Sequence, residues 1–156
     1  PEGASGSQGP PRRPRRFGRR VARVTYRIFS DGACRGNPGP AGAGAVILNP
    51  KGEIAHELAL PLGVTTNNVA EYQALIEALK YCRQKSFSPV EVFADSQLMI
   101  RQLQGVYKVK QPHLLVLFRE AQALLRELGC QGLYHVPREE NQAADRLANQ
   151  GLEMGL

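Results

Sequence analysis

Hydrophobic and polar residues alternate over residues 23–30 (RVTYRIFS), which is the pattern of a strand with one buried face. The Asp-Gly pair at residues 31–32 is expected to end this strand. A cluster of Gly, Asn and Pro at residues 36–40 predicts a turn, and residues 41–49 and about 53–60 are predicted to be the next two strands. The three neighbouring strands predict an antiparallel meander.

The apolar residues then change to a helical period, with Asn67 and Asn68 offering an N-cap. A helix is predicted over residues 69–84 from the spacing of Val69, Tyr72, Ile76 and Leu79. The remaining predicted elements are a strand at 90–94, a helix at 96–104 capped by Ser96, a helix at 112–128, a strand at 131–136, and a helix capped by Asn141 that runs to about residue 150.

The two later strands each follow a helix, so right-handed crossovers would add them parallel to the first strand. This order predicts the α/β class, with a mixed five-stranded sheet in which three strands are antiparallel and two are parallel. Helices are expected on both faces of the sheet.

The positive charge of the chain is concentrated at its N-terminus. The 156 residues contain 20 Lys and Arg against 14 Asp and Glu, a net charge of +6. Residues 1–20 hold six Arg and one acid, so the rest of the chain is nearly neutral. Because this segment is rich in Gly, Pro and Arg, we expect residues 1–20 to be a disordered tail or linker, followed by a folded domain at residues 21–156.

The cysteines and apolar runs exclude several classes of protein. Three widely spaced cysteines without a CxxC motif argue against a disulfide framework or a zinc ribbon and fit a reducing, cytoplasmic location. The longest aliphatic and aromatic run, residues 114–118, is too short to cross a bilayer. We expect a monomer without a membrane segment.

Four acids stand where ordinary packing explains them poorly, although each has a structural alternative when taken alone. Asp31 would be a turn residue, Asp95 a helix cap, and Asp145 an acid favoured by a helix N-terminus. Glu71 lies one turn into its helix on a line that borders the buried face, where a carboxylate needs a partner.

Taken together, the four acids predict one site. The first and fourth strands are expected to be neighbours that each end in an Asp, and the first turns of two helices can deliver the other two acids to the same edge. Four adjacent carboxylates cannot all ionise without cations, and oxygen ligands without His or Cys favour Mg²⁺ or Mn²⁺. Two such ions about 3.5–4 Å apart are a common apparatus for phosphodiester hydrolysis.

Four segments carry a family resemblance: residues 31–42 (DGACRGNPGPAG), 65–72 (TTNNVAEY), 94–97 (ADSQ) and 136–145 (VPREENQAAD). In this order they resemble the motifs of type 1 ribonuclease H, and they cover most of residues 23–150. The resemblance implies the ribonuclease H-like fold. It also implies an endoribonuclease that cuts the RNA strand of RNA–DNA hybrids and leaves 5′-phosphate and 3′-hydroxyl ends.

The same resemblance implies the roles of individual residues. Asp31, Glu71, Asp95 and Asp145 would be the catalytic acids that bind two Mg²⁺, with Mn²⁺ as a substitute. The substrate would be contacted by Cys34, Asn37, Thr66, Asn67 and Gln97, with Thr66 seating a DNA-strand phosphate. Two of these have structural alternatives, Asn37 as a turn residue and Asn67 as a helix cap.

The sequence departs from many ribonucleases H in two places. The interval of residues 105–113 is too short for the basic, Trp-bearing protrusion that holds substrate, and its only Lys residues are Lys108 and Lys110. The chain therefore resembles the short subgroup that lacks this protrusion. A loop His before the last acid is also missing, with Arg138 or Glu139 as candidates to replace it and His135 interpreted as structural or surface.

Two other functions fit the same fold. A hybrid- or duplex-binding module without chemistry would have lost an acid, and all four are present. A strand-transferase relative would use fewer acids and larger accessory domains. The arginines of the tail would either bind substrate phosphates in place of the protrusion or belong to a solvated linker.

Overall fold

The computed structural model describes residues 24–156, so the predictions made for the N-terminal tail lie outside the described residues. The elements run in the order β1 (Tyr26–Cys34), β2 (Gly39–Leu48), β3 (Ile54–Thr65), α1 (Asn67–Lys85), β4 (Val90–Ala94), α2 (Gln97–Leu103), α3 (Pro112–Glu127), β5 (Gly132–His135), a 3₁₀ turn η1 (Arg138–Glu140) and α4 (Gln142–Met154). This order confirms the predicted succession of strands and helices.

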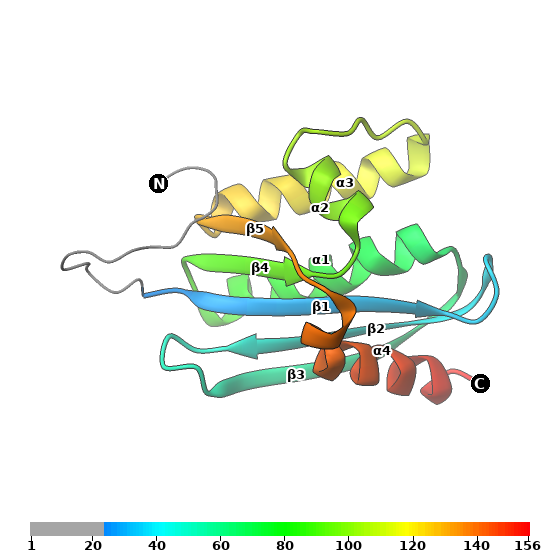
Figure 1. Ribbon diagram of the computed structural model, residues 1–156, viewed down its shortest axis with the longest axis horizontal. Coiled ribbons are helices and arrows are strands. Elements are labelled where there is room, and N and C mark those ends of the chain that lie inside the picture. Colours follow the sequence, from blue (N-terminus) through cyan, green and yellow to red (C-terminus); the bar gives the residue numbers. More distant parts are fainter. Residues whose placement is uncertain (1–23) are drawn as a thin grey trace.

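The strands form one five-stranded sheet in the order β3-β2-β1-β4-β5. The first three strands pair antiparallel, whereas β4 pairs parallel with β1 and β5 pairs parallel with β4. Figure 1 shows α1 behind the sheet and α4 in front of it, across β2 and β3. The mixed sheet with helices on both faces is therefore confirmed.

Strand β1 continues through the Asp-Gly pair that was expected to end it, so that expectation is wrong. Gly32 pairs with Ala43 of β2, and the strand runs to Cys34. The glycine serves close packing rather than a turn, because a Cβ atom at residue 32 would lie 2.6 Å from the carbonyl carbon of Ala70 and the amide nitrogen of Glu71. The absence of a Cβ atom at Gly32 lets α1 approach β1 directly.

Strand β3 is longer than the predicted segment of residues 53–60. It continues through Pro61 and Gly63, which are residues that usually interrupt a strand. Because β3 lies at the edge of the sheet, Pro61 can be accommodated without losing a bond to a neighbouring strand on its outer side. The pairing with β2 shifts register between Ala41 and Gly42, next to this proline.

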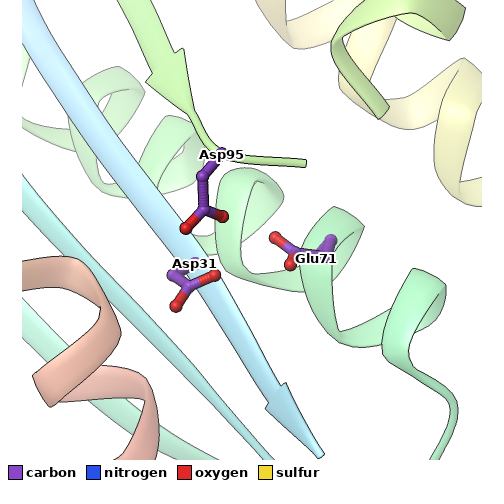
Figure 2. A group of neighbouring side chains, drawn as sticks. All are labelled: Asp31, Glu71 and Asp95. Carbon is purple, nitrogen blue, oxygen red and sulfur yellow. The ribbon is translucent and has the colours of Figure 1, made fainter. Parts of the chain in front are cut away.

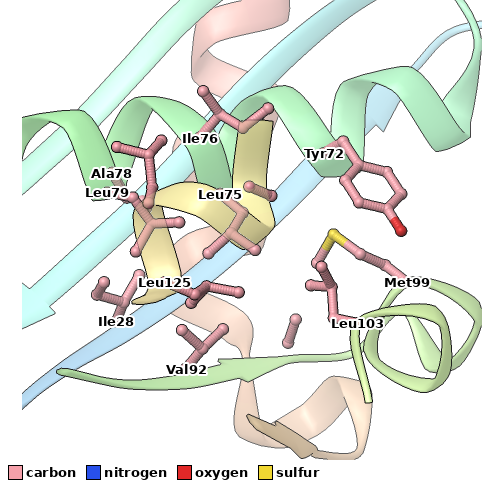
Figure 3. Close-up of a cluster of buried hydrophobic side chains, with 14 of the residues drawn as sticks. Ile28, Tyr72, Leu75, Ile76, Ala78, Leu79, Val92, Met99, Leu103 and Leu125 are labelled. Atoms are coloured by element: carbon pink, nitrogen blue, oxygen red, sulfur yellow. The ribbon is translucent and has the colours of Figure 1, made fainter. Parts of the chain in front are cut away.

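The main core lies between the sheet and helices α1 and α3. Figure 3 shows Tyr72, Leu75 and Leu79 of α1 among side chains from the sheet and from the other helices, and all three are fully buried. This apolar burial fixes the orientation of α1 about its axis, which directs Glu71 towards β1. No helix within residues 24–156 has the length and hydropathy needed to span a bilayer.

Candidate active site

Three of the predicted acids lie together at the middle of the sheet. Asp31 projects from β1, and Asp95 directly follows β4, whose last residue Ala94 pairs with Ser30. Glu71 approaches from α1, as Figure 2 shows. One carboxylate oxygen from each of the three acids lies within 4.8 Å of the others.

Residues other than the acids cap helices α1 and α2, so the carboxylates of Asp95 and Glu71 are not used as helix caps. The hydroxyl of Ser96 accepts a hydrogen bond from the amide of Met99 at 3.2 Å, so the predicted Ser96 cap is confirmed and Asp95 is not needed as one. Helix α1 is capped by Thr66, whose hydroxyl accepts from the amide of Val69 at 3.3 Å. The expected cap at Asn67 and Asn68 is wrong, because both residues already lie within the helix.

Glu71 is held by the strand that carries Asp31. Its Oε1 accepts a hydrogen bond from the amide of Gly32 at 3.2 Å. This contact requires the close approach of α1 that the missing Cβ of Gly32 permits. The Asp-Gly pair therefore serves the site twice, through the Asp31 carboxylate and through the Gly32 amide that holds Glu71.

Electrostatics within the cluster oppose full ionisation. Burial raises the pKa of Asp31 well above its usual range, and the charges of Glu71, Asp95 and Asp145 raise it further. Burial also raises the pKa of Glu71, with the charge of Asp95 as the second cause. A cation or a proton bound between the carboxylates would relieve this repulsion.

The fourth acid, Asp145, lies in the first turn of α4 and lines the same cleft as the other three. It belongs to a different layer, because α4 crosses the face of the sheet opposite α1. The helix can rest on β2 since a Cβ atom at Gly42 or Gly44 would collide with the backbone at Ala148. All four predicted acids are therefore brought to one open cleft of about 540 Å³.

Two of the five predicted substrate residues line this cleft, and Asn37, Thr66 and Gln97 are not among its lining residues. Cys34 and Asn67 line it, and the Cys34 thiol donates to the carbonyl oxygen of Gly36 at 2.6 Å. Asn37 accepts a hydrogen bond from the amide of Asn67 at 2.9 Å, which joins the loop after β1 to the start of α1. Gln97 is exposed and is not among the residues that line the cleft, and Thr66 serves as the helix cap.

The cleft also contains His135 and Asn149, which were not predicted as site residues, and Arg138, which was one of two candidates to replace the missing loop His. His135 at the end of β5 is exposed and forms part of the wall, together with Arg138 and Asn149. The position of His135 at the carboxyl end of a parallel strand was the available signal in the sequence, because such ends face the same edge as Asp95. Asn149 gave no comparable signal, since an exposed helical Asn has no distinctive pattern.

The donor set fits hard divalent cations. Asp31, Glu71 and Asp95 offer only carboxylate oxygens, and burial, together with the charge of Asp95, raises the pKa of both Asp31 and Glu71. Among the ion pairs formed by residues 24–156, none neutralises these three acids. Oxygen-only sites of this kind suit Mg²⁺ or Mn²⁺ better than zinc.

The fold and the acid cluster define a ribonuclease H-like domain. The chain belongs to the reverse transcriptase-like family, because the model of that family matches residues 29–151. It is 42% identical to ribonuclease HI of Halobacterium salinarum over 125 residues, which are 80% of this chain and 63% of that protein. It is also 42% identical to the bifunctional protein Rv2228c of Mycobacterium tuberculosis, but spans only 35% of its length.

Solved structures agree with this assignment. The fold is similar to the crystal structure of RNase H1 from Halobacterium salinarum, with a TM-score of 0.80 and 40% identity over 83% of this chain and 98% of that one. It is also similar to LC11-RNase H1 in complex with an RNA/DNA hybrid, with a TM-score of 0.78 and 43% identity over 84% and 99% of the two chains. The ribonuclease H-like fold implied by the sequence motifs is therefore confirmed.

Proposed function

We propose that this protein is an endoribonuclease that hydrolyses the RNA strand of RNA–DNA hybrids, as a type 1 ribonuclease H without the basic protrusion. The observation that carries the proposal is the grouping of Asp31, Glu71 and Asp95 within 4.8 Å, with Asp145 in the same cleft. The similar LC11-RNase H1 was solved with an RNA/DNA hybrid, which supports this substrate class. The short connection between α2 and α3 supports the subgroup.

The four acids would hold two Mg²⁺ ions, with Mn²⁺ as a substitute. Such ions, when bound, supply an activated water and stabilise charge on the leaving 3′ oxygen, so the products would carry 5′-phosphate and 3′-hydroxyl ends. The Gly32 amide fixes the Glu71 carboxylate, and the burial of Asp31 keeps its carboxylate away from bulk water. These contacts preorganise the acids before substrate arrives.

Substrate contacts would surround the acids. Cys34, Asn37, Asn67, Thr66 and Gln97 would contact sugar and phosphate groups, which requires polar side chains rather than a strongly basic surface. The Asn37 to Asn67 hydrogen bond holds two of these residues together. Arg138 lines the cleft and is the candidate for the missing loop His, where its guanidinium would attract a phosphate.

Activity on a labelled RNA–DNA hybrid tests the proposal. We expect cleavage by the wild type only when Mg²⁺ is present, and a loss of about 10³-fold or more in Asp31→Asn and Asp95→Asn, because several kcal/mol of transition-state stabilisation would disappear. Glu127→Gln is the matched control, since Glu127 is an exposed acid at the end of α3 that pairs with Arg83 of α1. This control should retain wild-type activity.

Equal cleavage by the wild type and both Asn variants would show that a contaminant is responsible and would overturn the proposal. Binding of the hybrid without any cleavage would favour the binding-module alternative. Parallel assays with double-stranded RNA and double-stranded DNA determine whether the hybrid is the preferred substrate.

A further inference from the structure

Asn141 is a buried polar residue whose side chain does not perform the role that its position indicates. It stands directly before α4, yet it makes no capping hydrogen bond with its side chain. It is 2% exposed, and its Oδ1 has no hydrogen-bond partner within the described residues. Because an unpaired buried acceptor costs about 1–3 kcal/mol, this asparagine is not explained by helix stability alone.

Asn141 instead joins the two backbones that carry Asp31 and Asp145, the first through its side chain and the second through its backbone. Its Nδ2 donates to the carbonyl oxygen of Ser30 at 3.0 Å, and Ser30 directly precedes Asp31. The backbone carbonyl oxygen of Asn141 accepts a hydrogen bond from the amide of Asp145 at 3.0 Å. Apolar contacts hold α4 on the sheet without fixing a direction, whereas a hydrogen bond has a preferred geometry. Asn141 therefore sets the start of α4 relative to β1.

A second asparagine contacts the Asp145 carboxylate itself. Asn149 lies one turn later in α4, and its Nδ2 donates to the carbonyl oxygen of Asp145 at 3.0 Å and to Asp145 Oδ1 at 3.3 Å. Asn149 also lines the cleft. Asp145 lies outside the group of three close carboxylates, and this contact restricts its side chain in addition to its interaction with Asp31.

We propose that Asn141 and Asn149 are positioning residues that hold Asp145 in place relative to Asp31. Asn141 ties the first turn of α4 to β1, and Asn149 donates a hydrogen bond to Oδ1 of the Asp145 carboxylate. The inference rests on the proposed function and adds two residues to the four acids. Neither asparagine touches the reacting atoms in this arrangement.

Mg²⁺ dependence distinguishes a positioning role from a merely structural one. In Asn141→Ala and Asn149→Ala we expect the Mg²⁺ concentration for half-maximal activity to rise about tenfold, as for other residues that orient metal ligands. We expect kcat on the hybrid to fall while KM stays near the wild-type value. Calorimetric titration with Mg²⁺ alone should show the same weakening, and Asn149→Gln, which keeps a donor, should restore part of it.

Asn49→Ala is the matched control. Asn49 accepts hydrogen bonds from the amides of Lys51 and Glu53 in the turn between β2 and β3, beside the start of β1 and away from the cleft. Its loss should lower the melting temperature without changing the Mg²⁺ dependence. The exposed Asn149→Ala variant should keep the wild-type melting temperature in EDTA, so it decides the test even where Asn141→Ala does not fold.

The proposal is overturned if Asn149→Ala binds Mg²⁺ as tightly as the wild type does. It is also overturned if Asn141→Ala, like Asn49→Ala, has a lower melting temperature but an unchanged Mg²⁺ dependence. A wild-type protein that binds Mg²⁺ but does not cleave the hybrid would overturn the proposed function alone. In that case the titrations of the two variants still decide whether the asparagines position Asp145.

Discussion

At the scale of single residues, burial and mutual repulsion oppose the ionisation of the acids that the fold brings into the cleft. Burial is the largest cause of the raised pKa of Asp31 and of Glu71, and neighbouring carboxylates add to it. Folding therefore makes the Asp31 carboxyl hold its proton more tightly than it does in the unfolded chain. The stability that this proton provides is fully present below the ordinary pKa of 3.8 and is lost as the pH rises through the folded-state pKa.

Replacing Asp31 by Asn, which is neutral without binding a proton, should therefore stabilise the metal-free protein at neutral and higher pH. In EDTA at pH 8 we expect Asp31→Asn to melt about 3–8 °C above the wild type, corresponding to about 1–3 kcal/mol. Calorimetric scans between pH 4.5 and pH 8.5 should show this difference shrinking as the pH falls. Glu127→Gln should show no such rise. A variant no more stable than the wild type at pH 8 would contradict the prediction.

The sequence patterns predicted that the four acids form one site, but they did not identify all of the residues around them. Asp31 and Asp95 could be found because they come at the points where neighbouring strands meet the same edge of the sheet. Asn141 was identified as the start of a helix, whereas its bond to Ser30 depends on a contact between segments 111 positions apart. Such a contact has no local sequence pattern, and the same is true of the cleft position of Asn149.

At the scale of elements, periodicity predicted the order of strands and helices but placed several boundaries wrongly. Gly32 was taken as the end of a strand because an Asp-Gly pair usually marks a turn. In the structure it is paired within β1, and its missing side chain accommodates the helix that carries Glu71. The third strand was likewise predicted to end near residue 60, whereas β3 continues through Pro61 because an edge strand accommodates a proline. Both errors arise because tertiary position, rather than local preference, decides the role of these residues.

A methyl group at Gly32 should separate α1 from β1. The new Cβ would meet backbone atoms of Ala70 and Glu71 at 2.6 Å, so the helix must shift and Glu71 must move from the cluster. We expect Gly32→Ala to cost about 1–3 kcal/mol of stability, and to lose activity beyond this effect because the Glu71 carboxylate is displaced. Melting curves and hybrid cleavage at a temperature where the variant remains folded measure the two effects.

Gly155→Ala is the control for this prediction. Gly155 is exposed at the end of α4, and the nearest atom to an added Cβ is the Pro61 Cβ at 3.0 Å. We expect near wild-type cleavage from it. Wild-type activity in Gly32→Ala would show that the close approach of α1 is not needed for the site.

At the scale of the whole molecule, charge is distributed unevenly between the N-terminal segment and the remainder of the chain. Residues 1–20 contain six Arg and a single acid, while the remainder of the chain combines a nearly neutral composition with an acidic cleft. A nearly neutral domain without a basic protrusion gains little affinity for phosphates from bulk charge. We propose that the N-terminal arginines supply non-specific contacts to the hybrid backbone.

Deleting residues 1–20 should weaken hybrid binding in a salt-dependent way. The slope of log affinity against log salt should become shallower by about 0.9 for each phosphate contact that is lost. Replacing the six arginines by Gln at constant length controls for the length of the segment, and the kcat at saturating substrate should stay the same in both variants. An unchanged slope would identify the segment as a linker.

The cleft is assembled from β1, α1, β4 and α4, and its four acids span residues 31–145. None of these segments contains more than one of the acids, and the last acid arrives from the opposite layer of the sheet. A partly folded chain in which α4 has not docked therefore lacks a complete site, whatever local structure it has formed. Catalytic competence in this architecture belongs to the cooperative native state and not to any intermediate of its folding.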